Sequence, residues 1–293
     1  MINLARLVRT ARPLELLLGA LTFTLGAGIS HYLGQTINIL TFVLGLLAVL
    51  SLQVAASWLV EQFRLPWLNL NEGESFTERE TFRVALLQSS YAALTLAGAI
   101  TISLFVTGKL NPPSVAMFAV IIIFLVVYAL PPLRLGEMGF GELILGVYLG
   151  TLLPSFAFLL EFGQFHRLLT FATFPLTLLA LAYFLILDFP SFATDLKIGR
   201  QSLLTRLTWQ RAVPIHHLLL LAAFLLFVAS TSFGVPWALV WPILAALPFA
   251  IVQIIWLQRI ALGGPTLWNF LTTLSLTTFG LAAYLLTFTF WIR

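Results

Sequence analysis

Nine apolar stretches, each about as long as a bilayer crossing, constrain the fold of this chain more than any other feature. A transmembrane helix needs about 20 mainly apolar residues. The predicted spans are residues 13–33, 37–60, 83–108, 113–130, 140–162, 173–189, 211–232, 236–257 and 267–291. We therefore expect an all-helical integral membrane protein of about nine helices, with residues 1–293 forming a single transmembrane domain.

Composition supports this class. Hydrophobic residues make up 60% of the chain and charged residues only 9%, and the mean hydropathy is +1.02, which does not describe a soluble domain. The chain has no cysteine, so disulfides, thiolate metal sites and cysteine nucleophiles are excluded. The basic start is followed by an apolar run that is too long for a signal peptide, so we expect a retained first span.

The basic residues predict the orientation. If the N-terminus is cytoplasmic, 12 of the 15 Lys and Arg residues fall on that side, and only Lys109, Arg167 and Arg293 fall on the other. This is a strong positive-inside bias. It places the two long polar segments, residues 61–82 and 190–210, on the cytoplasmic face. It also explains the net charge of +4 as membrane topology, so we expect no nucleic-acid partner.

The only two aspartates of the chain, Asp188 and Asp195, lie close together in the second polar segment. On a continuous helix they would share one face about 10.5 Å apart. They could hold separate Mg²⁺ ions, or one ion on each side of a bridging diphosphate. Lys197 and Arg200 follow them and would add positive charge for a diphosphate. The alternative is a solvated loop that obeys the positive-inside rule.

Two longer motifs resemble those of a known family. Residues 128–150 begin with a Tyr, continue through a Pro-Pro pair and Arg134, and reach the sequence Gly-Phe-Gly-Glu that ends at Glu142. Residues 195–203, Asp-Leu-Lys-Ile-Gly-Arg-Gln-Ser-Leu, follow later in the chain, and Arg12-Pro13 opens it. These features resemble the UbiA-type membrane prenyltransferases, especially the menaquinone-biosynthesis branch.

The resemblance implies a helical bundle around a central cavity, in an inner or cell membrane of a prokaryote. It implies two aspartate-rich motifs that bind Mg²⁺ and the diphosphate of a polyprenyl donor, whose prenyl group passes to a hydrophobic aromatic or quinone-precursor acceptor. On this basis Glu61, Asp188 and Asp195 are the candidate catalytic and Mg²⁺-binding residues. The candidate diphosphate-binding residues are Arg64, Arg134, Lys197 and Arg200.

The sequence also departs from the family pattern. Where the first aspartate-rich motif is expected, the chain reads Val-Glu-Gln-Phe-Arg over residues 60–64, and only Glu61 keeps a carboxylate. Arg64 stands at an aspartate position, as does Ser191 in the second motif. Glu61 and Arg64 could simply form a local ion pair. Two hypotheses therefore stay open, a prenyltransferase with a reduced metal site and a non-catalytic relative that binds a lipid or a partner. A transporter ranks last because no internal repeat is visible.

Four further polar residues carry structural expectations. Glu142 is expected to stabilise the N-terminus of the fifth span through the helix dipole. Glu15 is expected to pair with Arg12 or with the second motif. His216 and His217 are expected at the membrane interface rather than at a metal.

Overall fold

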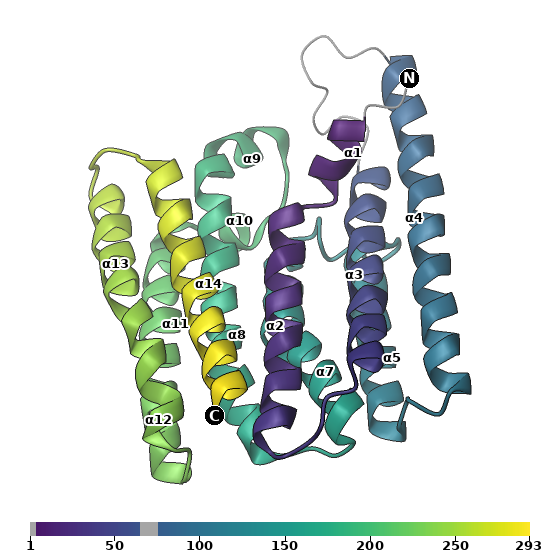
Figure 1. Cartoon of the computed structure of the whole chain (residues 1–293). Coiled ribbons are helices and arrows are strands. Elements are labelled where there is room, and N and C mark those ends of the chain that lie inside the picture. Colours follow the sequence, from purple (N-terminus) through teal and green to yellow (C-terminus); the bar gives the residue numbers. More distant parts are fainter. Residues whose placement is uncertain (1–3, 65–75) are drawn as a thin grey trace.

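The structure is a computed structural model that describes residues 4–64 and 76–293. Within these residues, nine helical segments are long and apolar enough to cross a membrane, and they form one bundle (Figure 1). In chain order the nine spans are α2 (Pro13–Tyr32), α3 (Ile39–Gln62), α4 (Phe76–Val106), α5 (Pro112–Ala129), α6 to α7 (Gly141–Phe162), α8 to α9 (Arg167–Ile198), α11 with η3 (Trp209–Phe233), α12 to α13 (Trp237–Ala261) and α14 (Trp268–Ile292). The nine-span, all-helical prediction is confirmed.

Several spans contain short turns of a different helix type. These pieces are α6 (Gly141–Val147), the π-helical turn η1 (Tyr148–Leu152), α7 (Leu153–Phe162), α8 (Arg167–Asp188), the 3-10 turn η2 (Phe189–Ser191), α9 (Phe192–Ile198), α11 (Trp209–Ala229), the 3-10 turn η3 (Ser230–Phe233), α12 (Trp237–Val240), the 3-10 turn η4 (Trp241–Ala246) and α13 (Leu247–Ala261). Two short helices, α1 (Leu4–Thr10) and α10 (Leu203–Leu207), complete the described fold. Helices α1, α9 and α10 lie at the same end of the bundle, called here the α9 end (Figure 1).

Two spans are longer than hydropathy alone predicts. Helix α4 begins at Phe76 rather than at residue 83, because Glu and Arg lower hydropathy without opposing helix formation. The sixth span begins at Arg167 rather than at residue 173, and it does not stop at Pro190. Proline lacks a backbone N–H, and the chain passes Pro190 in the tight turn η2 before continuing as α9.

The fifth and sixth spans form the centre of the bundle. In their most apolar windows 83% and 72% of the residues are buried, against 22% for α4 at the periphery. A close approach of η1 to α8 supports this packing, since a Cβ on Gly150 would lie 2.5 Å from Oγ1 of Thr177. Thr177 is hydrogen-bonded at 2.7 Å to Thr151 beside that glycine. The close packing of the centre therefore positions the segments that leave it at the α9 end.

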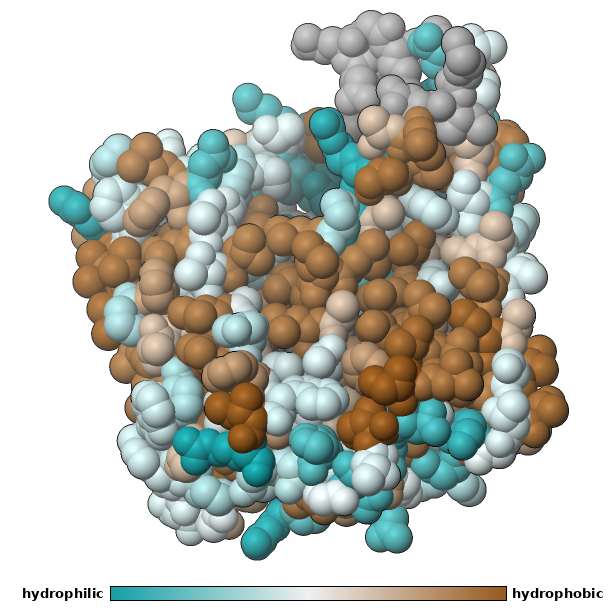
Figure 2. Space-filling model, in the orientation of Figure 1, coloured by the Kyte–Doolittle hydropathy of each residue, from teal (hydrophilic) through white to brown (hydrophobic). Residues whose placement is uncertain are grey.

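The surface agrees with a membrane environment. Figure 2 shows hydrophobic residues across the middle of the molecule and hydrophilic residues gathered toward its two ends. Exposed aliphatic and aromatic residues occur on the outer helices, including Ile102 at 64% and Leu225 at 68% exposure. Such a surface is stable only against hydrocarbon. The protein is an integral membrane protein.

Candidate diphosphate-binding site

Four connecting regions meet at the α9 end and enclose a cavity of about 240 Å³. They are the link before α2, the end of α3, the link between α5 and α6, and the link between α9 and α10. The lining residues are Arg12, Val60, Arg64, Arg134, Gly136, Glu137, Met138, Gly199, Arg200 and Gln201. Four arginines and one glutamate thus surround one small space, and this arrangement favours an anionic ligand.

Arg12 enters the cavity from the start of α2. Because Pro13 disfavours right-handed helical geometry at the preceding residue, Arg12 adopts a left-handed conformation with φ of 55°. Its guanidinium donates to Glu15 at 3.2 Å and to the hydroxyl of Tyr128 at 3.4 Å. The expected pairing of Glu15 with Arg12 is confirmed.

Arg64 follows the last turn of α3. Its guanidinium lies 2.9 Å from the carboxylate of Glu61, one helical turn earlier. Three residues on a helix bring side chains to the same face, so this pair is geometrically easy. The local ion pair that was one interpretation of Glu61 and Arg64 is therefore present.

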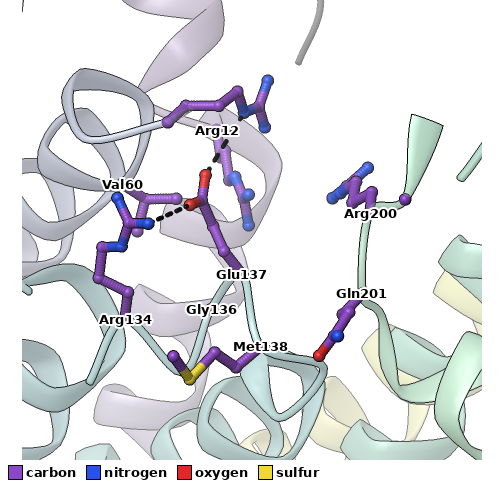
Figure 3. Close-up of a pocket in the computed structure, with 10 residues that line it drawn as sticks. Arg12, Val60, Arg134, Gly136, Glu137, Met138, Arg200 and Gln201 are labelled. Carbon is purple, nitrogen blue, oxygen red and sulfur yellow. Dashed lines mark ion pairs between the residues drawn. The ribbon is translucent and has the colours of Figure 1, made fainter. Parts of the chain in front are cut away.

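Arg134 and Glu137 come from the link between α5 and α6. Arg134 has φ of 38°, and its Nη1 donates to the carbonyl oxygen of Phe63 at 2.6 Å. Glu137 lies between two guanidiniums, 3.8 Å from Arg134 and 3.9 Å from Arg64. Figure 3 shows its side chain reaching toward Arg134, with Arg200 across the cavity. Burial raises the pKa of the Glu137 carboxyl, and Arg134 and Arg64 oppose that shift.

The same link is tied to the segment after α9. Met138 and Gln201 form an isolated parallel bridge, and the Nε of Arg206 in α10 donates to the carbonyl oxygen of Met138 at 2.5 Å. The Arg206 guanidinium also stacks over the Phe140 ring at 4.4 Å. These contacts hold two walls of the cavity together.

The second aspartate-rich segment supplies Arg200. Asp195 in α9 is buried, accepts from the Ser191 hydroxyl at 2.8 Å, and lies 3.5 Å from the Arg200 guanidinium. Gly199 ends α9 in the left-handed conformation, so the chain turns there and brings Arg200 to the cavity. Lys197 is exposed on α9 and is not among the lining residues.

Asp188 lies deeper, at the last residue of α8. It is 9% exposed, and its Oδ2 has no hydrogen-bond partner among the described residues. The ionisable side chain that interacts most strongly with it is Glu142 in the first turn of α6, and Glu142 accepts the backbone N–H of Leu203 at 3.2 Å. Glu142 therefore connects α6 with α10, a contact that the predicted role at the helix N-terminus did not include.

The structure thus sorts the predicted site residues into two groups. Arg64, Arg134 and Arg200 line one cavity, while Glu61 and Asp195 pair with two of these arginines from behind the lining. In residues 4–64 and 76–293, no group of three or more His, Asp or Glu side chains is placed to hold one metal ion. Loop residues 65–71, which continue the first motif, lie outside the described residues.

Two charged residues of the cavity, Arg12 and Glu137, were not predicted as site residues. The Arg-Pro pair that opens the chain was a usable signal for Arg12, since it fixes an arginine directly before a span. Glu137 gave no comparable signal, because a single carboxylate in a link looks like any solvated charge.

A family comparison agrees with this geometry. The model of the UbiA prenyltransferase family matches residues 83–263. The chain belongs to the UbiA prenyltransferase family. The matched region contains both the residue 128–150 motif and the residue 195–203 motif. No curated protein sequence matches the chain.

Solved structures support the same fold. The chain is similar to a UbiA homolog from Archaeoglobus fulgidus bound to GPP and Mg²⁺, with 16% identity, a TM-score of 0.63, and coverage of 98% of this chain and 99% of that one. An apo UbiA homolog from Aeropyrum pernix K1 has 17% identity, a TM-score of 0.60, and coverage of 90% and 95%. A digeranylgeranylglyceryl phosphate synthase has 15% identity, a TM-score of 0.58, and coverage of 98% of both chains.

Proposed function

We propose that residues 1–293 form a single transmembrane domain that transfers a polyprenyl group from a prenyl diphosphate to a hydrophobic aromatic or quinone-precursor acceptor. The observation that carries the proposal is the cavity of four arginines at the α9 end of the two central spans. The structure from Archaeoglobus fulgidus that shares this fold was solved with GPP and Mg²⁺. The positive-inside bias supports a cytoplasmic position for the cavity, and we propose a prokaryotic inner or cell membrane as its location.

The arginines account for recognition of the donor. A guanidinium offers parallel N–H groups that fit phosphate oxygens, and it keeps its charge when buried. Arg64, Arg134 and Arg200 reach the cavity from three different links, so together they can contact several oxygens of a diphosphate. Stabilising the charge that develops on the leaving diphosphate favours cleavage of the bond to the prenyl carbon.

The carboxylates fit one Mg²⁺ better than two. Mg²⁺ is usually held by one or two carboxylates together with substrate phosphates and water. Among the described residues, Oδ2 of Asp188 is buried without a hydrogen-bond partner, so Asp188 would hold this ion. Asp195 is seven residues further along the chain and about 10.5 Å away on a continuous helix, so it would not share that ion and would instead hold Arg200 toward the diphosphate. Glu61 is already neutralised by Arg64 at 2.9 Å. When bound, Mg²⁺ would neutralise negative charge on the leaving diphosphate.

The apolar bundle accounts for protection of the reactive prenyl group. Val60 lines the cavity and belongs to the large apolar core together with Leu59 and Tyr128. This core excludes water from the space beside the arginines, and a carbocation formed there would meet few competing nucleophiles. Tyr128 also contacts Arg12, which joins the apolar and cationic parts of the site.

Donor binding tests this function. We would incubate the purified protein in detergent with a labelled prenyl diphosphate and Mg²⁺, and measure binding and diphosphate release. The substitution Arg200→Gln is expected to weaken donor binding by about tenfold or more, because a charge-assisted hydrogen bond contributes about 1.5–3 kcal/mol. Asp195→Ala is expected to reduce release by orders of magnitude.

The matched control is Arg211→Gln, which removes an exposed arginine at the start of α11 that does not line the cavity. It should leave donor binding unchanged. Equal loss in both arginine variants would contradict the proposed site. Tight donor binding without turnover, unaffected by a chelator, would instead favour the non-catalytic relative.

A further inference from the structure

Among the described residues, Glu137 is the one acidic residue in the cavity lining, and its contacts differ from those of the other charged groups. Its carboxylate lies 3.9 Å from the Nε of Arg64 and 3.8 Å from an Nη of Arg134. Both distances exceed that of a hydrogen bond, and Oε2 is buried without a hydrogen-bond partner among the described residues. Glu137 therefore offsets part of the positive charge of the two arginines without a hydrogen bond to either of them.

The two arginines are oriented by other groups. Arg64 is held by Glu61 at 2.9 Å, and Arg134 donates to the carbonyl oxygen of Phe63 at 2.6 Å. Removal of Glu137 would leave both of these short contacts in place. The guanidiniums are thus preorganised around a position that the Glu137 carboxylate fills only loosely.

We propose that Glu137 is an internal counter-ion that occupies the anion position of the arginine cavity and is displaced when a diphosphate binds. This inference rests on the proposed function and deepens it by naming a residue that sets the affinity of the same site. A carboxylate carries one negative charge and a diphosphate carries more, so the diphosphate displaces the Glu137 carboxylate from the arginines. Its affinity is lower than it would be without this carboxylate. The same competition would speed departure of the diphosphate product, a step that often limits turnover.

The proposal has a pH signature. The charged groups that face Glu137 are Arg64, Arg134, Glu61 and Arg200, and the arginines do not titrate in the working range. The pKa of Glu137 is raised by burial, so protonation, which removes the competing charge, begins at a higher pH than for an exposed glutamate. Anion affinity of the unmodified protein should therefore rise as pH falls through the pKa of Glu137, more steeply than in a variant without this carboxyl group.

Binding of inorganic pyrophosphate to the full-length protein in detergent, with EDTA present, tests the inference. We expect Glu137→Gln to bind pyrophosphate about tenfold more tightly or better at neutral pH. The difference between the variant and the unmodified protein should shrink as pH falls, and this comparison cancels the protonation of pyrophosphate itself. The matched control is Glu80→Gln, which removes a carboxylate paired with Arg83 at 3.1 Å outside the cavity, and its affinity should not change.

The outcomes separate this inference from the proposed function. Binding in the unmodified protein with the same or weaker affinity in Glu137→Gln overturns the counter-ion role and leaves the proposed function intact. Binding that appears only in Glu137→Gln supports the counter-ion role. Absence of binding in both proteins overturns the counter-ion role, whereas the proposed function is judged separately by binding of the labelled prenyl diphosphate in the presence of Mg²⁺. A melting temperature that falls in Glu137→Gln and recovers with pyrophosphate would further support an anion position built by the arginines.

Discussion

A glycine at position 26 allows α2 to pack directly against the backbone of α7. A Cβ at this position would lie 2.7 Å from the carbonyl carbon of Pro154 and 2.9 Å from the Cβ of Ala157. Real Cβ atoms do not approach other atoms so closely, and the nearest of these groups are backbone, which cannot rotate away. The separation of α2 and α7 is therefore set by the missing side chain, and α2 carries Arg12 at its start.

We expect Gly26→Ala to destabilise the protein by about 1–3 kcal/mol, since overpacking forces backbone shifts. The control is Gly98→Ala in α4, where an added Cβ would meet no atom within 4 Å. This control should be neutral or slightly stabilising, by up to about 1 kcal/mol, because alanine favours helix. Thermal unfolding in detergent measures both. A normal melting temperature for Gly26→Ala would show that α2 can move away from α7.

At the scale of helices, a buried polar network joins α11, α13 and α14. Nε2 of Gln253 is 2.7 Å from His216 Nε2 and donates to Ser275 at 3.1 Å, while its Oε1 accepts from Thr278 at 3.2 Å. All four side chains are at most 1% exposed. Sequence reasoning placed His216 at the membrane interface. The structure places His216 inside the bundle, with Gln253 of α13 as a buried partner.

Replacement of Gln253 by methionine should remove this connection at nearly constant size. Interhelical hydrogen bonds in membrane proteins contribute about 0.6 kcal/mol each on average, so we expect a loss of about 1–2 kcal/mol in unfolding free energy. The control is Gln258→Met on the same helix at an exposed position. Titration with a denaturing detergent measures the difference in unfolding free energy between the two variants. Equal stability would contradict a stabilising role for the hydrogen bonds that join α11, α13 and α14.

At the scale of the whole molecule, the spans formed by the described residues place the two ends of the bundle on opposite sides of the membrane. The cationic cavity and the links around α9 share one end, and the positive-inside bias predicts that this end is cytoplasmic. Because the chain has no cysteine, single introduced cysteines report their own location. Leu262, between α13 and α14, is 79% exposed, and Phe165, between α7 and α8, is 68% exposed.

We expect a membrane-impermeant thiol reagent to label Phe165→Cys in intact cells, and to label Leu262→Cys only after permeabilisation. The physical reason is that translocation of Lys and Arg across the membrane is disfavoured, so basic links stay in the cytoplasm. Labelling of both variants after permeabilisation controls for accessibility. The reverse labelling pattern in intact cells would place the arginine cavity on the outer side of the membrane. A prenyl diphosphate in the cytoplasm could then not reach it.

Membrane class, the number of spans and most of their boundaries could be predicted from the sequence alone. The reason is physical, because a fixed hydrocarbon thickness sets the length of each apolar run, and backbone groups in lipid must be paired within a helix. The pairing of Glu61 with Arg64 could also be anticipated, since helix geometry brings residues three apart together. The exceptions are the starts of α4 and α8 and the end of the sixth span, where helix continues beyond the apolar run.

Only the tertiary structure decided which charges share one space. Arg12, Arg64, Arg134 and Arg200 are separated by up to 188 positions in the sequence, and they meet because four links converge at one end of the bundle. The same packing places Glu137 among them and buries His216 against Gln253. The length of each apolar run and the bias of Lys and Arg are properties of local segments, and so the sequence by itself determines the membrane fold. Contacts between distant links depend on how the helices pack, and so the structure determines the anion site.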